Sequence, residues 1–116
     1  MEFENRRQRR RQLIFYLPVH DRATGEKLGL LGDITTEGLL IISREAIPEG
    51  QVLELEIVNN TSHPLPTPLR LRGESRWSHP DVNPDYYATG VELLEVDART
   101  QGAIGKLVSE IGFTDH

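Results

Sequence analysis

The sequence has 116 residues, of which 13 are Lys or Arg and 18 are Asp or Glu, for a formal net charge of -5. That length suits one domain, and 37% hydrophobic with 27% charged residues is typical of a folded soluble protein. The absence of cysteine excludes a disulfide framework, a thiolate metal site and a cysteine nucleophile. No apolar run approaches the roughly 20 residues that span a bilayer. We therefore expect a cytoplasmic protein with no membrane insertion.

The positive charge is concentrated near the start of the sequence, in the five arginines at positions 6, 7, 9, 10 and 11. Without these five, the chain keeps eight of its 13 basic residues against 18 acidic ones, a net of -10. Adjacent arginines repel one another and have nothing to bury, so residues 1–11 are predicted to be a flexible arm ahead of a folded domain over 12–116. A long nucleic acid needs a broad basic face. A short arm on an acidic body instead suits a small anion, and no long nucleic acid is expected as a partner.

Six segments are rich in β-branched and aromatic residues or alternate between apolar and polar types, which predicts strands. They cover residues 13–20, 27–34, 39–43, 51–58, 69–77 and 86–96. Turn residues separate them, among them Gly25, expected in the left-handed conformation, and Gly50. In the segment 69–77, Trp77 continues the apolar face of the strand, so we expect it in the core.

The end of the chain changes to a helical period. Asp97 is a plausible N-cap, and four apolar residues follow at helical spacing, which predicts a helix over about 97–111 that docks its apolar side on the sheet. These four are Ile104, Leu107, Val108 and Ile111. Six short strands and one terminal helix favour an all-β fold, a six-stranded antiparallel β-barrel with a C-terminal helix, because closure removes exposed sheet edges.

The arginine cluster is the first candidate for binding chemistry. A guanidinium group is a planar fork that can hold phosphate oxygens, or guanine O6 and N7, with two parallel hydrogen bonds, and it can stack on a purine. A solvated basic tail with no specific ligand is the alternative interpretation of such a charge run.

The second candidate is the hexapeptide Asp33-Ile34-Thr35-Thr36-Glu37-Gly38, between two predicted strands. Asp33 can accept hydrogen bonds from the N1–H and N2–H edge of guanine, and Thr35 projects to the same side of an extended strand. Gly38 permits a positive φ or the close approach of a ligand. Alternatively, these residues form a turn held by local bonds of the Asp and Thr side chains.

Taken together, an RRxxxR arrangement before a strand and a DxTxxG turn some 22 residues after it resemble the PilZ domain family of bacterial cyclic di-GMP receptors. The family signature is RxxxR followed by [D/N]xSxxG, on a six-stranded antiparallel split barrel with a C-terminal helix. Thr35 stands where the family more often has Ser, and Arg6/Arg10 and Arg7/Arg11 both satisfy RxxxR. The ligand-binding residues that the resemblance implies are Arg6, Arg7, Arg11, Asp33, Thr35 and Gly38, with Arg10 in the alternative register.

The resemblance implies a receptor for cyclic di-GMP with no catalytic activity and no cofactor, whose arm orders on the ligand so that a downstream protein partner can read the new surface. Two alternatives stay open. One is a PilZ-like protein-interaction adaptor that binds no nucleotide; the other, which the acidic body disfavours, is a small RNA-binding barrel. No nucleophile–base pair is evident, and the four histidines at positions 20, 63, 79 and 116 have no metal-ligand spacing.

Overall fold

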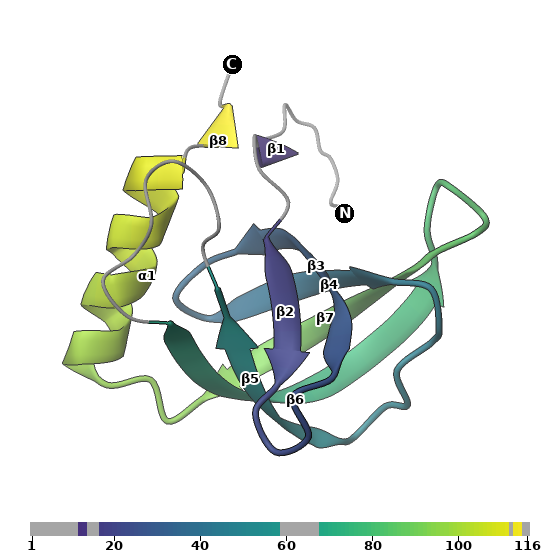
Figure 1. Cartoon of the computed structure of the whole chain (residues 1–116), viewed down its shortest axis with the longest axis horizontal. Coiled ribbons are helices and arrows are strands. Elements are labelled where there is room, and N and C mark those ends of the chain that lie inside the picture. Colours follow the sequence, from purple (N-terminus) through teal and green to yellow (C-terminus); the bar gives the residue numbers. More distant parts are fainter. Residues whose placement is uncertain (1–11, 14–16, 59–67, 112, 115–116) are drawn as a thin grey trace.

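The computed structural model describes residues 12–13, 17–58, 68–111 and 113–114. Within these residues, six strands close into an antiparallel barrel in the order β2-β3-β4-β7-β6-β5, with one helix, α1, beside it (Figure 1). This confirms the predicted fold class. The barrel strands are β2 (Pro18–Asp21), β3 (Lys27–Ile34), β4 (Gly38–Ser43), β5 (Val52–Ile57), β6 (Leu69–Pro80) and β7 (Tyr87–Leu94). The arginine arm lies outside the described residues.

The core fills the barrel because the strands alternate between inward apolar and outward polar side chains. In β5, Leu53, Leu55 and Ile57 are buried, whereas Glu54 and Glu56 between them are only half-buried. Leu17, Val19, Leu31, Ile41, Leu55 and Ile57 have no accessible surface. The outward face is therefore free to carry charges, and the inward face supplies the hydrophobic stabilisation.

Two of the predicted turns depend on glycine. Gly25 has φ of 78° and Gly50 has φ of 79°, in the left-handed region that residues with a Cβ rarely adopt. Gly25 closes the β2–β3 hairpin, where its N–H donates to the carbonyl of Asp21 at 2.7 Å. The prediction of a hairpin with Gly25 in the left-handed position is confirmed.

The helix α1 (Ala98–Ile111) begins as the sequence indicates. The Oδ1 of Asp97 accepts a hydrogen bond from the Thr100 N–H at 2.8 Å, which confirms Asp97 as the N-cap. Ile104 and Leu107 are buried and Val108 is half-buried, so this side of the helix packs on the barrel, where α1 contacts β6. No helix of the described residues is long and apolar enough to cross a membrane.

The first predicted strand, 13–20, is wrong in its bounds. β1 (Gln12–Leu13) pairs outside the barrel with β8 (Phe113–Thr114), and the barrel strand β2 starts separately at Pro18 (Figure 1). Proline has no N–H to donate, which suits the first position of a strand. Pairing with β8 depends on the chain end folding back, and no local pattern carries that information.

The last two barrel strands also differ from their predicted ranges. β6 continues to Pro80 rather than ending at Trp77, because it pairs with β7 as far as Pro80↔Tyr87. β7 ends at Leu94 rather than at residue 96. The next residue, Glu95, has φ of 56°, and a left-handed residue cannot continue the strand.

Candidate functional site

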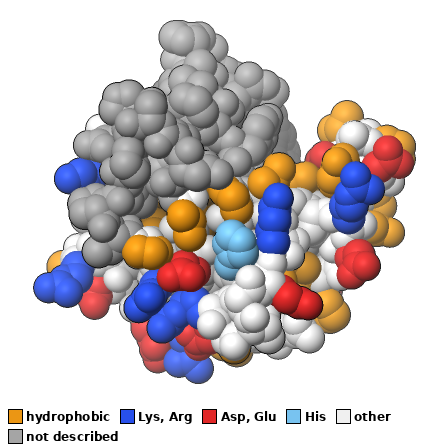
Figure 2. All heavy atoms as spheres, viewed as in Figure 1, with side chains coloured by type: hydrophobic (Ala, Val, Ile, Leu, Met, Phe, Trp, Pro, Cys, Tyr) orange, Lys and Arg blue, Asp and Glu red, His pale blue; other side chains and the backbone are white. Residues whose placement is uncertain are grey.

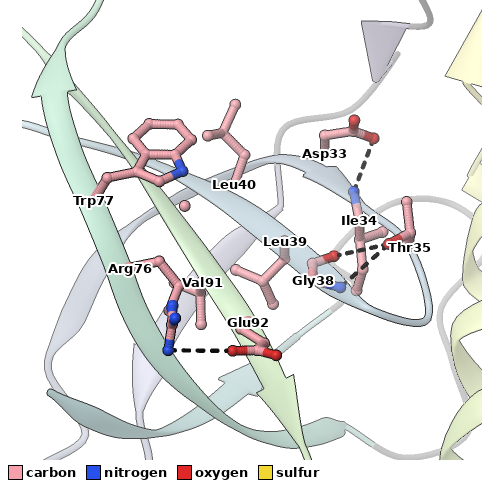
Figure 3. A pocket seen from close by; sticks show the side chains of 11 residues that line it. Asp33, Ile34, Thr35, Gly38, Leu39, Leu40, Arg76, Trp77, Val91 and Glu92 are labelled. Atoms are coloured by element: carbon pink, nitrogen blue, oxygen red, sulfur yellow. Dashed lines mark hydrogen bonds and ion pairs between the residues drawn. The ribbon is translucent and has the colours of Figure 1, made fainter. Parts of the chain in front are cut away.

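A cavity of about 480 Å³ opens where the turn between β3 and β4 faces β6 and β7 (Figure 3). We call it the motif cavity, because Asp33, Thr35 and Gly38 of the predicted motif all line it. Its lining residues are Asp33, Ile34, Thr35, Gly38, Leu39, Leu40, Arg76, Trp77, Gly90, Val91 and Glu92. The structure therefore brings together the three motif residues that lie within the described part of the chain.

Hydrogen bonds of the Thr35 hydroxyl hold the β3–β4 turn. Its Oγ1 accepts from the N–H of Glu37 at 3.1 Å and from the N–H of Gly38 at 3.2 Å. The Thr35 N–H donates to the Gly38 carbonyl at 2.8 Å, closing the turn. The carboxylate of Asp33 accepts from the Ile34 N–H at 2.9 Å. The local bonds of the alternative interpretation are thus present, and they position both side chains at the cavity.

Gly38 is needed for close packing rather than for an unusual backbone conformation. Among the described glycines, only Gly25 and Gly50 have positive φ, so the positive φ considered for Gly38 is wrong. Gly38 pairs with Glu92 in the β4–β7 ladder, and a Cβ at position 38 would lie 2.7 Å from the Val91 carbonyl oxygen. Glycine at this position lets β4 approach the β7 backbone at the floor of the cavity.

Trp77 lies at the surface, which corrects the prediction that it belongs to the core. β6 has a bulge at this point: Ser75 pairs with Val91, and Trp77 pairs with the next residue of β7, Gly90. The extra residue in β6 reverses the alternation of inward and outward side chains. Ser75 remains buried, whereas Trp77 is 39% exposed and lines the motif cavity. Figure 3 shows Trp77 and Asp33 at opposite ends of the cavity, with Leu40 between them.

The neighbours of Trp77 explain why the indole lies flat on the sheet. A Cβ at position 90 would lie 2.6 Å from the indole Nε1, so the ring occupies the space that Gly90 leaves open. The imidazole of His79 stacks beside it, with 5.1 Å between ring centroids. In the sequence, Gly90 inside the predicted strand 86–96 indicates such a contact, because a glycine within a strand often marks a close approach or a bulge.

The described wall of the motif cavity has one positive and two negative groups. Arg76 is the single basic residue among the described residues that line it, and Asp33 and Glu92 are the acidic ones. The Nη1 of Arg76 lies 3.4 Å from Oε1 of Glu92 and 3.6 Å from Oε1 of Glu74. This wall is not by itself attractive to an anion. Arg6, Arg7, Arg10 and Arg11, which the sequence assigns to the site, lie outside the described residues.

The strand directions show from which side the chain enters the barrel. The Leu31 N–H donates to the carbonyl of Leu17 at 2.8 Å, and Pro18 pairs with Leu30. Because β2 and β3 are antiparallel, moving back from Leu17 toward the N-terminus corresponds to moving along β3 toward Asp33. β1 also contacts β3. The chain thus enters β2 from the end of β3 that carries Asp33.

Among the described residues, no cluster of three His, Asp or Glu side chains could hold a metal ion. The motif cavity presents hydrogen-bond acceptors, an exposed aromatic ring and a half-exposed arginine on a rigid sheet. Such a surface is suited to binding a polar molecule with a planar ring.

No protein-family model matches this sequence, and no curated protein matches it at a significant level. The fold is similar to that of the solved structure of the Bacillus subtilis inhibitor of motility, MotI/DgrA, with a TM-score of 0.65 over 89% of this chain. The two sequences are 19% identical, and this chain covers 50% of that one. At this identity, the likeness shows that the two chains share a fold.

Proposed function

We propose that this chain is a receptor domain for cyclic di-GMP, which it binds in the motif cavity, and that the bound form is read by a protein partner. One observation carries the proposal: Asp33, Thr35 and Gly38, chosen from the sequence as a ligand-binding turn, line one cavity with an exposed indole. No catalytic role is proposed for any residue.

The chemistry of the cavity suits a guanine. Asp33 can accept hydrogen bonds from the N1–H and N2–H edge of the base, and the exposed part of the Trp77 indole can contact a purine ring. At about 480 Å³, the cavity is within the range of small-molecule sites, which is roughly 300 to 1,000 Å³. The site is already built on four strands, β3, β4, β6 and β7, so binding requires little rearrangement of the barrel.

The arginine arm supplies the positive charge that the described wall lacks. The chain enters β2 from the Asp33 end of β3, and β1 contacts β3, which supports the assignment of the arm to this site. Arg7 and Arg11, with Arg6 in support and Arg10 in the alternative register, would hold the two phosphates and the guanine O6 and N7 atoms. Ordering of the arm on the ligand creates the surface that a partner recognises.

Calorimetric titration of the full 116-residue chain with cyclic di-GMP tests the proposal, with cyclic di-AMP and the linear dinucleotide pGpG as competitors. We expect cyclic di-GMP to bind saturably and cyclic di-AMP, which has no guanine, not to bind in the same way. Asp33→Ala should weaken binding strongly while the thermal melt of the free protein stays close to wild type. Asp85→Ala, which removes the same charge from the β6–β7 loop, is the matched control. If no heat of binding is detected at tens of micromolar cyclic di-GMP, the proposal that the chain is a receptor is refuted.

A protein-interaction adaptor without nucleotide is the second candidate. The observation that favours it is the local bonding of the motif, in which the Thr35 hydroxyl and the Asp33 carboxylate both accept from backbone N–H groups of the same turn. A motif retained only to build that turn would need no ligand. The name of the structural neighbour, an inhibitor of motility, fits a regulatory protein of either kind. Partner binding that is unchanged by cyclic di-GMP would favour this candidate.

A further inference from the structure

Two glutamates face each other beside the motif cavity, and one arginine lies between them. Glu74 on β6 and Glu92 on β7 are direct cross-strand partners. Like charges in that position destabilise a sheet. The Nη1 of Arg76 lies 3.6 Å from the carboxylate of Glu74 and 3.4 Å from that of Glu92, so its charge offsets their repulsion. Figure 3 shows Arg76 directed toward Glu92 along the lower side of the cavity.

Arg76 is placed to exchange these partners for another anion. Its side chain is 55% exposed and that of Glu92 is 54% exposed, so the guanidinium can turn without uncovering the core. It lines the same cavity as Asp33 and is adjacent in sequence to Trp77. A guanidinium presents several N–H donors in one plane and binds phosphate oxygens in a bidentate manner.

On the basis of the proposed function, we propose that Arg76 is a further phosphate-binding residue of the site and that Glu92, together with Glu74, restrains it. A phosphate of the ligand must then compete with Glu92 for the same guanidinium. Glu92 sets the affinity through Arg76, and the site is tuned to bind more weakly than its cationic groups would allow.

The size of the effect follows from the exposure of the pair. Exposed arginine–carboxylate pairs are worth little in water, so release of Arg76 from Glu92 should strengthen ligand binding by about two- to fivefold. Loss of Arg76 itself removes a charge-assisted bond to the ligand and should weaken binding by about tenfold.

The experiment is a double-mutant cycle on the full chain, with Kd for cyclic di-GMP measured by calorimetry. The variants are Glu92→Gln, Arg76→Gln and both together. The sole tryptophan of the chain, Trp77, lines the cavity, so its fluorescence gives a second readout at the same site. Glu95→Gln is the matched control, because Glu95 pairs with Arg72 at 3.4 Å. Arg72 also pairs with a second glutamate, Glu54, just as Arg76 also pairs with Glu74.

We expect Glu92→Gln to tighten binding in the wild-type background and to have no such effect when Arg76 is Gln, while Glu95→Gln leaves Kd unchanged. Weaker binding by Glu92→Gln would mean that Glu92 positions Arg76 for the ligand and would overturn the proposal. An equal gain in both backgrounds would also overturn it, because Glu92 would then act by direct repulsion. Binding by wild type with no response to any variant refutes this inference alone. Absence of binding by wild type refutes the proposed function and this inference with it.

Discussion

Two clefts on the outer wall of the same barrel differ in how their charges are arranged. The motif cavity, of about 480 Å³, has an exposed indole, apolar side chains and few charges. The second cleft, of about 270 Å³, is rich in arginine and glutamate, and we call it the ion-paired groove. Its lining residues are Arg22, Glu54, Arg70, Leu71, Arg72, Leu94, Glu95, Val96 and Thr100.

Each arginine of the ion-paired groove already has a carboxylate partner. Arg22 lies 3.6 Å and Arg72 lies 3.1 Å from Glu54, and Arg70 lies 3.2 Å from Glu56. The same mixing of signs is visible across the face shown in Figure 2, where Lys and Arg are interspersed with Asp and Glu. The number of arginines in a cleft therefore does not measure its capacity for anions. An anion-binding site needs positive charge that is either unpaired or can be released from its carboxylate partners by the ligand.

The largest expected difference between the two clefts is in ligand affinity. The double variant Arg7→Ala/Arg11→Ala should weaken cyclic di-GMP binding by at least about 100-fold, because it removes charge-assisted bonds to the ligand. Arg22→Ala/Arg70→Ala removes the same charge from the ion-paired groove and should leave Kd within about twofold. Calorimetry measures both, and thermal melts check that each variant is folded. Equal losses of affinity in the two double variants would show that binding depends only on the total charge of the protein.

Gly38→Ala tests whether the motif cavity depends on close strand packing. The added Cβ would meet the Val91 carbonyl at 2.7 Å, and we expect a loss of about 1–3 kcal/mol in the free energy of unfolding. Gly102→Ala is the matched control, because a Cβ at this helical position would meet nothing within 4 Å beyond its chain neighbours and the backbone of its own helix. That variant should gain up to about 1 kcal/mol. Urea unfolding of both distinguishes a packing effect from a general effect of replacing glycine.

Trp77→Leu tests the aromatic surface, which the ion-paired groove lacks. We expect cyclic di-GMP binding to weaken by about tenfold, because a stacked base contributes about 1–3 kcal/mol. Trp77→Phe should retain most of the affinity, since it keeps an aromatic face. Titration calorimetry gives the three Kd values. If the Leu and Phe variants bind alike, the indole contributes only apolar area.

The smallest expected effect concerns the start of α1, whose Thr100 borders the ion-paired groove. The hydrogen bond from the Thr100 N–H lowers the pKa of Asp97 below its ordinary value of 3.8. The carboxylate thus stabilises the fold at pH values above 3.8, and this contribution is lost as the pH falls through the lower pKa of the folded state.

Melting temperatures of wild type and Asp97→Asn between pH 2 and pH 6 test this titration. Asparagine also caps helices but carries no charge, so the small advantage of wild type should disappear toward pH 2. A constant difference across that range would mean that the titration of Asp97 does not contribute.

Most of the barrel could be predicted because alternation is a local property. In β5 and in the first half of β6, every second side chain points inward, so the residue types alone indicate which side chains are buried. The β-bulge after Ser75 is different. It depends on where β6 meets β7, and the buried hydroxyl of Ser75 bonds to the Pro48 carbonyl at 2.6 Å and to the Gln51 N–H at 3.0 Å. No window of sequence around Trp77 contains those partners.

The sequence by itself determined that the chain separates into an arm with five arginines and a body with a net charge of -10. It also determined which turn would carry Asp33, Thr35 and Gly38, since turn residues act on their immediate neighbours. Only the tertiary structure decided that Arg76, Trp77 and Glu92 join that turn, because they come from strands more than 30 residues away in the chain. It also decided which carboxylates pair with Arg22, Arg70, Arg72 and Arg76, because ion pairs depend on distance in space.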